Sequence, residues 1–252
     1  MKIENVFQLE LSRSELLWLV DTLGFVQFPL LGVENLSNDI QSDELTIAQQ
    51  KLLDRGLVTY QPNSGWQVEK MLMVISQLIA NPDKVLMSQI WNRDGTSRRA
   101  FAYPSQDFPL FVEDAGCLHF TLHPRPSGLV AQQQAFFKLP AKPILARKSF
   151  SVPNKVLPYF LNVTESEINV AFAESGISEK EAVKLVKSLE VIKSMGIQST
   201  LLSRDGDLES ISQKYLIWND KNIFGGVWAK EVQATEFKAF IVSSAYKWIR
   251  AG

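Results

Sequence analysis

The chain has 252 residues, which is enough for one large domain or for two small ones that each bury a core. Apolar residues make up 46% and charged residues 21%, a balance that excludes wholesale disorder. The 26 Lys and Arg residues nearly cancel the 27 Asp and Glu residues, and the net charge of −1 excludes a general attraction to nucleic acid or to an anionic membrane.

The cellular address is predicted from three further features. Cys117 is the single cysteine, so no disulfide forms within the chain. The first residues lead to no apolar segment of signal-peptide length, and no apolar run reaches the roughly 20 residues of a membrane span. We therefore expect a cytoplasmic protein that does not bind membranes.

The first third of the chain carries local signals of helices and a hairpin. Ser12 and Glu15 have the spacing of a capping box, which predicts a helix that starts there and ends at Gly24. Further along, Gly56 stops a second helix, and an Asn-Ser-Gly turn at Asn63 indicates a hairpin. The predicted elements are a helix over residues 43–55, a hairpin over 57–68 and a helix over 69–80.

Strands follow from residue 85. An Arg-Asp-Gly turn at Arg93 separates predicted strands 85–91 and 97–103. A second predicted pair covers 109–113 and 117–123, and a helix over 128–138 comes next. The Pro-containing segment 139–147 then reads as a stiff linker. The predicted organisation is an N-terminal half (1–138), a linker (139–147) and a C-terminal half (148–252).

The C-terminal half repeats the plan of the first. Residues 88–95 (SQIWNRDG) parallel residues 199–206 (STLLSRDG) at an offset of 111 residues. The predicted fold class is α+β, with two similar halves in a pseudo-two-fold arrangement and an antiparallel sheet flanked by helical bundles. The elements expected in this half are helices 153–160, 165–173, 178–196 and 235–250, and strands 197–203, 208–218 and 222–229.

No catalytic constellation is recognisable. The only histidines are His119 and His123, and strand alternation puts Cys117 and His119 on one face without further ligands at metal spacing. Glycine-rich phosphate loops are missing from the sequence, and the neighbours Glu113 and Asp114 are expected at a solvated turn. We expect no enzyme activity, no cofactor and no metal.

Two alternatives stay open. The helix over residues 43–55 and the turn after it have the order of a winged helix, which predicts a nucleic-acid-binding regulator. A recognition helix should be basic, however, and Lys51 and Arg55 stand here against Asp43, Glu44 and Asp54. A structural role is therefore favoured for this helix. The other alternative is an enzyme whose site the sequence hides.

Six further segments stand out along the chain: LSRSELL at residues 11–17, LLDRGLV at 52–58, NPDKVL at 81–86, RRAFA at 98–102, LIWND at 216–220 and GVW at 226–228. Together they resemble the EspG family, the cytosolic chaperones of type VII secretion systems. The resemblance implies a quasi-two-fold α+β fold and a protein without enzyme activity. It also implies a helical protein client, a secreted substrate in that family, which docks mainly on the C-terminal half.

Residues expected to bind this client are Trp218, Phe224 and Trp228. They lie in a short stretch that also contains Leu216 and Ile223, more large apolar surface than one strand face buries. Aromatic side chains are the usual anchors of protein interfaces. The predicted core consists of Trp18, Leu52, Leu53, Val74, Leu78, Val186 and Leu189.

Overall fold

The computed structural model describes residues 5–24, 42–92, 94–105, 107–137, 180, 194–204, 207–218, 223–225 and 230–231. The helices predicted over 153–160, 165–173 and 235–250 lie outside these residues, as do most of the helix predicted over 178–196 and the linker 139–147. The domain boundaries therefore stay a prediction. Within the described residues, no helix is long and apolar enough to cross a membrane.

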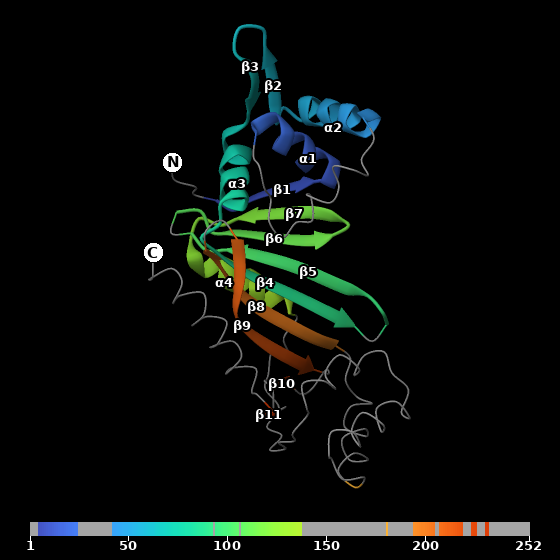
Figure 1. Ribbon diagram of the computed structural model, residues 1–252, viewed down its shortest axis with the longest axis vertical. Helices are drawn as coiled ribbons and strands as arrows, with labels where there is room; N and C mark the ends of the chain where they lie inside the picture. The colour runs from blue at the N-terminus through green and yellow to red at the C-terminus, as the bar shows by residue number, and fades with distance from the viewer. Residues whose placement is uncertain are drawn as a thin grey trace. The chain divides into compact units, whose positions relative to one another are not determined.

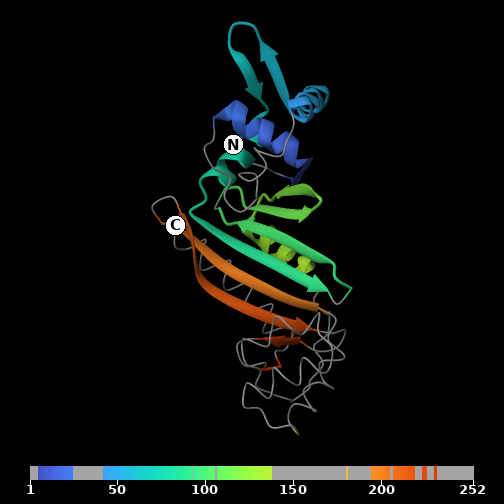
Figure 2. The same cartoon turned by 45° about the vertical axis from the view of Figure 1, so that its right-hand side comes forward.

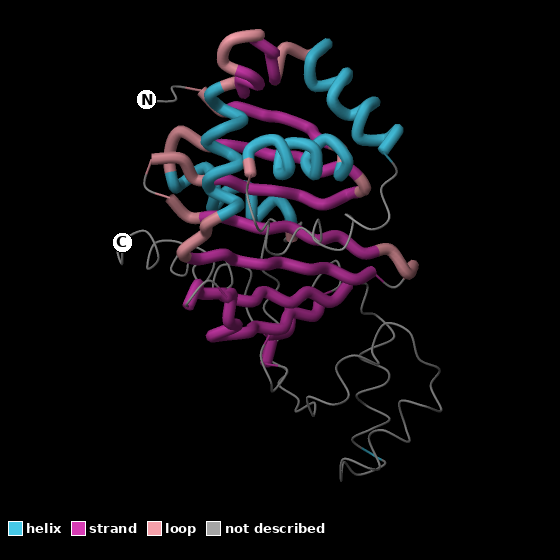
Figure 3. The backbone as a smooth tube through the Cα atoms, turned by 45° about the horizontal axis from the view of Figure 1, so that its top comes forward, coloured by secondary structure: helices cyan, strands magenta, loops and turns pink. Residues whose placement is uncertain are grey.

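A large sheet runs through the chain, as Figures 1 and 3 show. Where the residue partners are defined, neighbouring strands pair antiparallel, so the predicted α+β class with a large antiparallel sheet is confirmed. In the order of their hydrogen bonding the strands are β1 (Phe7–Leu11), β7 (Cys117–Leu122), β6 (Leu110–Ala115), β5 (Ser97–Tyr103), β4 (Lys84–Asn92), β8 (Ser194–Arg204), β9 (Asp207–Trp218), β10 (Ile223–Gly225) and β11 (Lys230–Glu231).

Two compact units make up the chain. The first contains Met1–Val85, Phe101–Leu129 and Leu201–Glu209. The second contains Leu86–Ala100, Val130–Thr200 and Ser210–Gly252. In the second unit, helix α4 (Pro126–Phe136) ends near β5, where the Arg98 guanidinium lies 4.9 Å from the centre of the Phe136 ring. The start of α4 belongs to the first unit, which also contains the site described below.

The helices and the small hairpin of the first unit lie where local sequence signals predict them. Helix α1 (Arg13–Leu23) begins at the predicted capping box and ends at Gly24 in the left-handed conformation, with φ of 67°. Helix α2 (Ser42–Asp54), the hairpin of β2 (Val58–Gln61) and β3 (Gly65–Val68), and helix α3 (Lys70–Ala80) follow as predicted. Figure 2 shows the hairpin beside α2.

The core of the first unit lies between the inner face of its strands and the helices. Trp18 and Leu52 are buried as predicted, whereas Leu53 is only half-buried. Val74 and Leu78 are likewise only half-buried, and the fully buried residues of α3 are Leu72, Ile75 and Ile79. This helix is apolar on nearly every side, so its sequence alone does not fix the buried face. Val186 and Leu189 lie outside the described residues.

The structure differs from the sequence prediction most clearly at three elements. Strand β1 was not predicted; it is a five-residue segment whose partner β7 lies more than a hundred residues away. Strand β8 begins at Ser194, where the sequence predicted a helix as far as residue 196. Helix α4 begins at Pro126, two residues before the prediction.

The register of β4 and β8 bears on the proposed duplication. Ser203 N–H donates to the Asp83 carbonyl (2.9 Å), and Ser194 Oγ bonds Asn92 Oδ1 (2.7 Å), so the strands run antiparallel. Residues of the same parity therefore share a sheet face across this pair. A two-fold axis perpendicular to the sheet would relate β4 to β8 and keep each pair of equivalent residues on the same face. Equivalent residues must then be separated by an even number of positions. The predicted offset of 111 residues is odd, so it does not fit this register.

The two Arg-Asp-Gly turns also differ in length. In the first, Asn92 N–H donates to the Thr96 carbonyl (2.8 Å), Gly95 N–H donates to the Asn92 carbonyl (3.0 Å), and Gly95 has φ of 83°, which is a turn with a bulge. In the second, only two residues separate β8 from β9. Aligning the turns by sequence therefore shifts the strands that follow them.

Candidate functional site

A polar network surrounds the start of α1. Ser12 caps the helix: its Oγ accepts from Glu15 N–H (3.2 Å), and Glu15 Oε2 accepts from Ser12 N–H (2.7 Å). The predicted capping box is therefore present with both of its hydrogen bonds. Because these two hydrogen bonds hold the Glu15 side chain against the backbone, the position of its second carboxylate oxygen, Oε1, is fixed.

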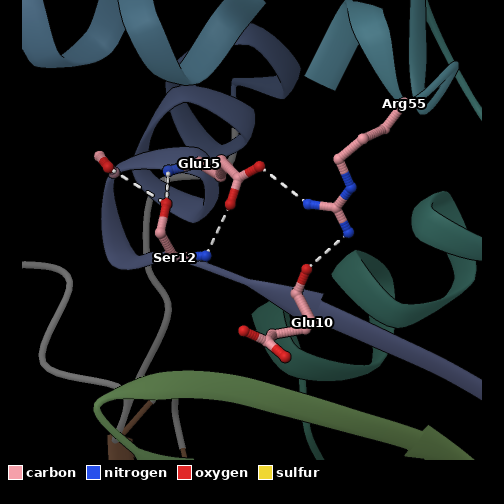
Figure 4. A network of polar contacts seen from close by, with 5 residues as sticks. Glu10, Ser12, Glu15 and Arg55 are labelled. Carbon is pink, nitrogen blue, oxygen red and sulfur yellow. Dashed lines mark hydrogen bonds and ion pairs between the residues drawn. The ribbon is translucent and has the colours of Figure 1, made fainter. Parts of the chain in front are cut away.

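Arg55 meets that oxygen from the end of α2. Its Nη1 donates to Glu15 Oε1 (2.9 Å), and its Nη2 donates to the main-chain carbonyl of Glu10 in β1 (2.7 Å), as Figure 4 shows. The side chain of Glu15 is 6% exposed and that of Arg55 is 38% exposed. One guanidinium thus connects a buried carboxylate, a helix cap and the backbone of β1.

A second ion pair stands nearby and corrects a sequence expectation. Arg13 Nη2 lies 2.8 Å from Asp114 Oδ2, and the side chain of Asp114 is only 9% exposed. Glu113 and Asp114 belong to strand β6 rather than to a solvated turn. The expectation failed because the cation that pairs with Asp114 lies a hundred residues earlier in the chain.

The network of Ser12, Glu15 and Arg55 borders a surface pocket of about 510 Å³. It is lined by Glu10, Ser12, Glu15, Lys51, Asp54, Arg55 and Cys117. Three carboxylates face two cations there, and the Glu15 and Arg55 charges largely cancel each other. No group of three or more potential metal ligands occurs among the described residues. The pocket is suited to polar contacts, and its charges give little preference for either sign of ligand.

Cys117 is a poor nucleophile in this setting. Partial burial raises the pKa of its thiol, and the neighbouring Glu10 carboxylate raises it further. The thiol therefore stays protonated at neutral pH. His119 shares its strand face, as predicted, but its Nδ1 lies toward Glu10 Oε2 (3.5 Å) on the exposed surface. Leu118 and Phe120 occupy the buried face of the same strand.

The outer face of α2 does not have the charge of a recognition helix. Asp43, Glu44 and Asp54 are exposed beside Lys51, and Arg55 is engaged by Glu15 and Glu10. Such a surface repels phosphate more than it attracts it. The order of helix and hairpin matches a winged helix, but the electrostatics oppose nucleic-acid binding at this place.

The residues predicted to bind a client are only partly described. Trp218 ends β9 and pairs with Ile223, whereas Phe224 pairs with Ile217. Trp228 lies outside the described residues. The network around Arg55 was not predicted from the sequence, apart from the capping-box signal of Ser12 and Glu15.

Comparison with known proteins gives a fold neighbour and no family. No protein-family model matches the sequence, and no curated protein does. Among solved structures, the chain is similar to a chaperone of a type VII secretion system. That structure is of Mycobacterium tuberculosis EspG5 in complex with the PE25–PPE41 dimer. The TM-score is 0.58 and the identity 9%, over 93% of this chain and 94% of the matched chain, which shows a common fold.

Proposed function

We propose that this protein is a non-catalytic chaperone or adaptor that holds a helical protein client in the cytoplasm. The observation that carries the proposal is the fold similarity to the EspG5 complex over 93% of the chain. Similarity over nearly the full length supports a common architecture rather than one common hairpin. The sequence segments that resemble the EspG family are also spread over the chain, from residues 11–17 to 226–228.

The chemistry around the polar pocket is consistent with a binding role. The Cys117 thiol is held protonated by partial burial and by Glu10, and the buried carboxylates of Glu15 and Asp114 are each paired with an arginine. These arrangements stabilise the fold and leave none of these three groups activated for catalysis. We accordingly propose a function without cofactor, nucleic acid or membrane.

The proposed client surface lies on the second half of the chain and includes Trp218, Phe224 and Trp228. The adjacent strands β9 and β10 bring Trp218 and Phe224 close along the backbone. Each residue is to be tested by itself.

We also propose that the chain consists of two similar halves, whose equivalent residues are separated by an even number of positions in place of the predicted 111. Its support is that each Arg-Asp-Gly turn joins two strands that are consecutive in the chain and in the sheet. An experimental structure in which the β4–β5 and β8–β9 hairpins do not superpose by a two-fold rotation would exclude the duplication.

The decisive experiment is affinity purification of the tagged protein from its native host, with mass-spectrometric identification of the partner. Single alanine variants of Trp218, Phe224 and Trp228 are then compared in client binding. Loss of a true anchor should cost about 2 kcal/mol or more, roughly a thirtyfold weaker Kd. Tyr60→Ala is the matched control, because Tyr60 is an exposed aromatic residue of the other half (58% exposed).

Two results distinguish a failure of the proposed function from a failure of the proposed client surface. If no protein partner is recovered, the chaperone function is wrong. If a helical client is recovered but all three variants, folded by circular dichroism, bind it as well as Tyr60→Ala does, the function stands and the proposed surface is wrong.

A further inference from the structure

Strand β1 stands at one end of the strand order and pairs with β7 along one side. The Glu10 carbonyl accepts from Arg55, so this peptide points away from β7. In an antiparallel pair, alternate residues direct both N–H and C=O to the partner strand, and the residues between them direct both groups away. Gln8 therefore directs its N–H and C=O to the same side as Glu10, where no strand among the described residues pairs with β1, whereas Phe7, Leu9 and Leu11 bond to β7.

An open row of backbone donors and acceptors is a template for a further strand. Two groups of this row are occupied. Arg55 holds the Glu10 carbonyl, and Glu15 Oε2 holds the Ser12 N–H at 2.7 Å. Arg55 and Glu15 are themselves an ion pair, with 2.9 Å between Nη1 and Oε1. The side chains of Glu15 and Arg55 thus occupy backbone hydrogen-bonding groups at the C-terminal end of the β1 edge.

We propose that the Glu15–Arg55 ion pair guards the edge of β1 against pairing with β1 of a second copy of this chain. Antiparallel pairing of two β1 strands about Gln8 sets Glu10 opposite Val6, whose side chain is 51% exposed, so like charges do not face each other. That register requires the Glu10 carbonyl to accept from the Val6 N–H of the other copy. Arg55 already occupies this carbonyl, so the added strand loses its outer hydrogen bonds.

The test uses Arg55→Met, which removes the donors and keeps an unbranched apolar side chain. Its matched control is Arg13→Met. The two arginines are similarly exposed (38% and 32%), and each pairs with a carboxylate side chain that is less than a tenth exposed (6% and 9%). The two arginines differ in that Arg55 also donates a hydrogen bond to the Glu10 carbonyl at the β1 edge. Association is measured on the full chain by light scattering after size exclusion, over a range of concentrations, with wild type as reference.

Arg55→Met should associate at a concentration at least about tenfold lower than wild type does, the effect of about one charge-assisted hydrogen bond. Arg13→Met should behave as wild type. Adding Gln8→Pro to Arg55→Met should restore the wild-type mass, because proline removes the N–H on the open side and leaves the bonds to β7 intact. The Gln8 amide should also exchange quickly in wild type and slowly in associated Arg55→Met.

Three results would contradict the proposal that the Glu15–Arg55 ion pair prevents pairing at the β1 edge. In the first, Arg55→Met keeps the wild-type mass at every concentration. In the second, both arginine variants associate equally, which means that lost stability is the cause. In the third, Gln8→Pro leaves the association of Arg55→Met unchanged, which means that another surface is used.

Discussion

Gly128 lies directly against the ring of His123. A Cβ added at Gly128 would stand 2.5 Å from His123 Nδ1 and 2.9 Å from Cγ, too close for any real contact. The His123 backbone is held in turn, because its N–H donates to the Pro109 carbonyl at 2.8 Å. The side chain is buried, so the ring has little room to withdraw. The contact fixes the first turn of α4 against the end of β7.

Gly128→Ala should therefore destabilise the protein even though alanine is the better helix former. The propensity gain is about 0.5–1 kcal/mol, and overpacking a buried contact costs about 1–3 kcal/mol. Urea unfolding should therefore show a net loss, of up to about 2.5 kcal/mol. Ser127→Ala, at an exposed neighbouring position of the helix, should be nearly neutral. A Gly128→Ala protein as stable as wild type would mean that the ring moves freely.

His123 should make stability fall as the pH drops below about 6.5. Burial lowers the pKa of this imidazole below its ordinary value, so the unfolded chain takes up the proton first. Stability is fully present above the unfolded pKa, and it declines by up to about 1.4 kcal/mol per pH unit until the folded pKa is reached. Urea unfolding between pH 7.5 and 5 measures the slope. His123→Asn should flatten it in this range.

Leu52→Ala should cost about 2–5 kcal/mol in the free energy of unfolding, because Leu52 is 0% exposed in the first unit. Leu53→Ala should cost clearly less, because its side chain is only half-buried. The two neighbours are chemically identical deletions on one helix, so their difference isolates burial. Equal losses in denaturant unfolding would contradict the orientation of α2.

Elements with local causes were predictable from the sequence. The capping box of Ser12 and Glu15 and the turn at Asn63 each depend on residues a few positions apart, and both helix and hairpin lie where expected. Strand β1 has no such signal. It is a strand because β7 supplies its hydrogen bonds from a distant part of the chain.

The candidate site was hidden for the same reason. The sequence located Glu15 as a capping residue but not its partner Arg55, forty positions later. It likewise gave no cation for Asp114. The offset of 111 residues shows the opposite error: a local match between two Arg-Asp-Gly turns was extended to whole strands, although a turn does not fix the register of the strands it joins.

The last prediction concerns the hairpin of β2 and β3, which is tied to α1 by aromatic contacts. Trp18 and Trp66 meet edge to face with ring centres 5.0 Å apart, and Trp66 meets Tyr60 at 5.2 Å. Trp18 is buried and Tyr60 is exposed, so the inner contact should contribute more to stability. A double-mutant cycle of Trp18→Leu and Trp66→Leu should give a coupling of about 0.5–1.5 kcal/mol in unfolding experiments. The same cycle with Tyr60→Leu and Trp66→Leu should give a smaller one. If the Trp18 cycle shows no coupling, the hairpin is held by its backbone connection to α2 and α3 and not by these rings.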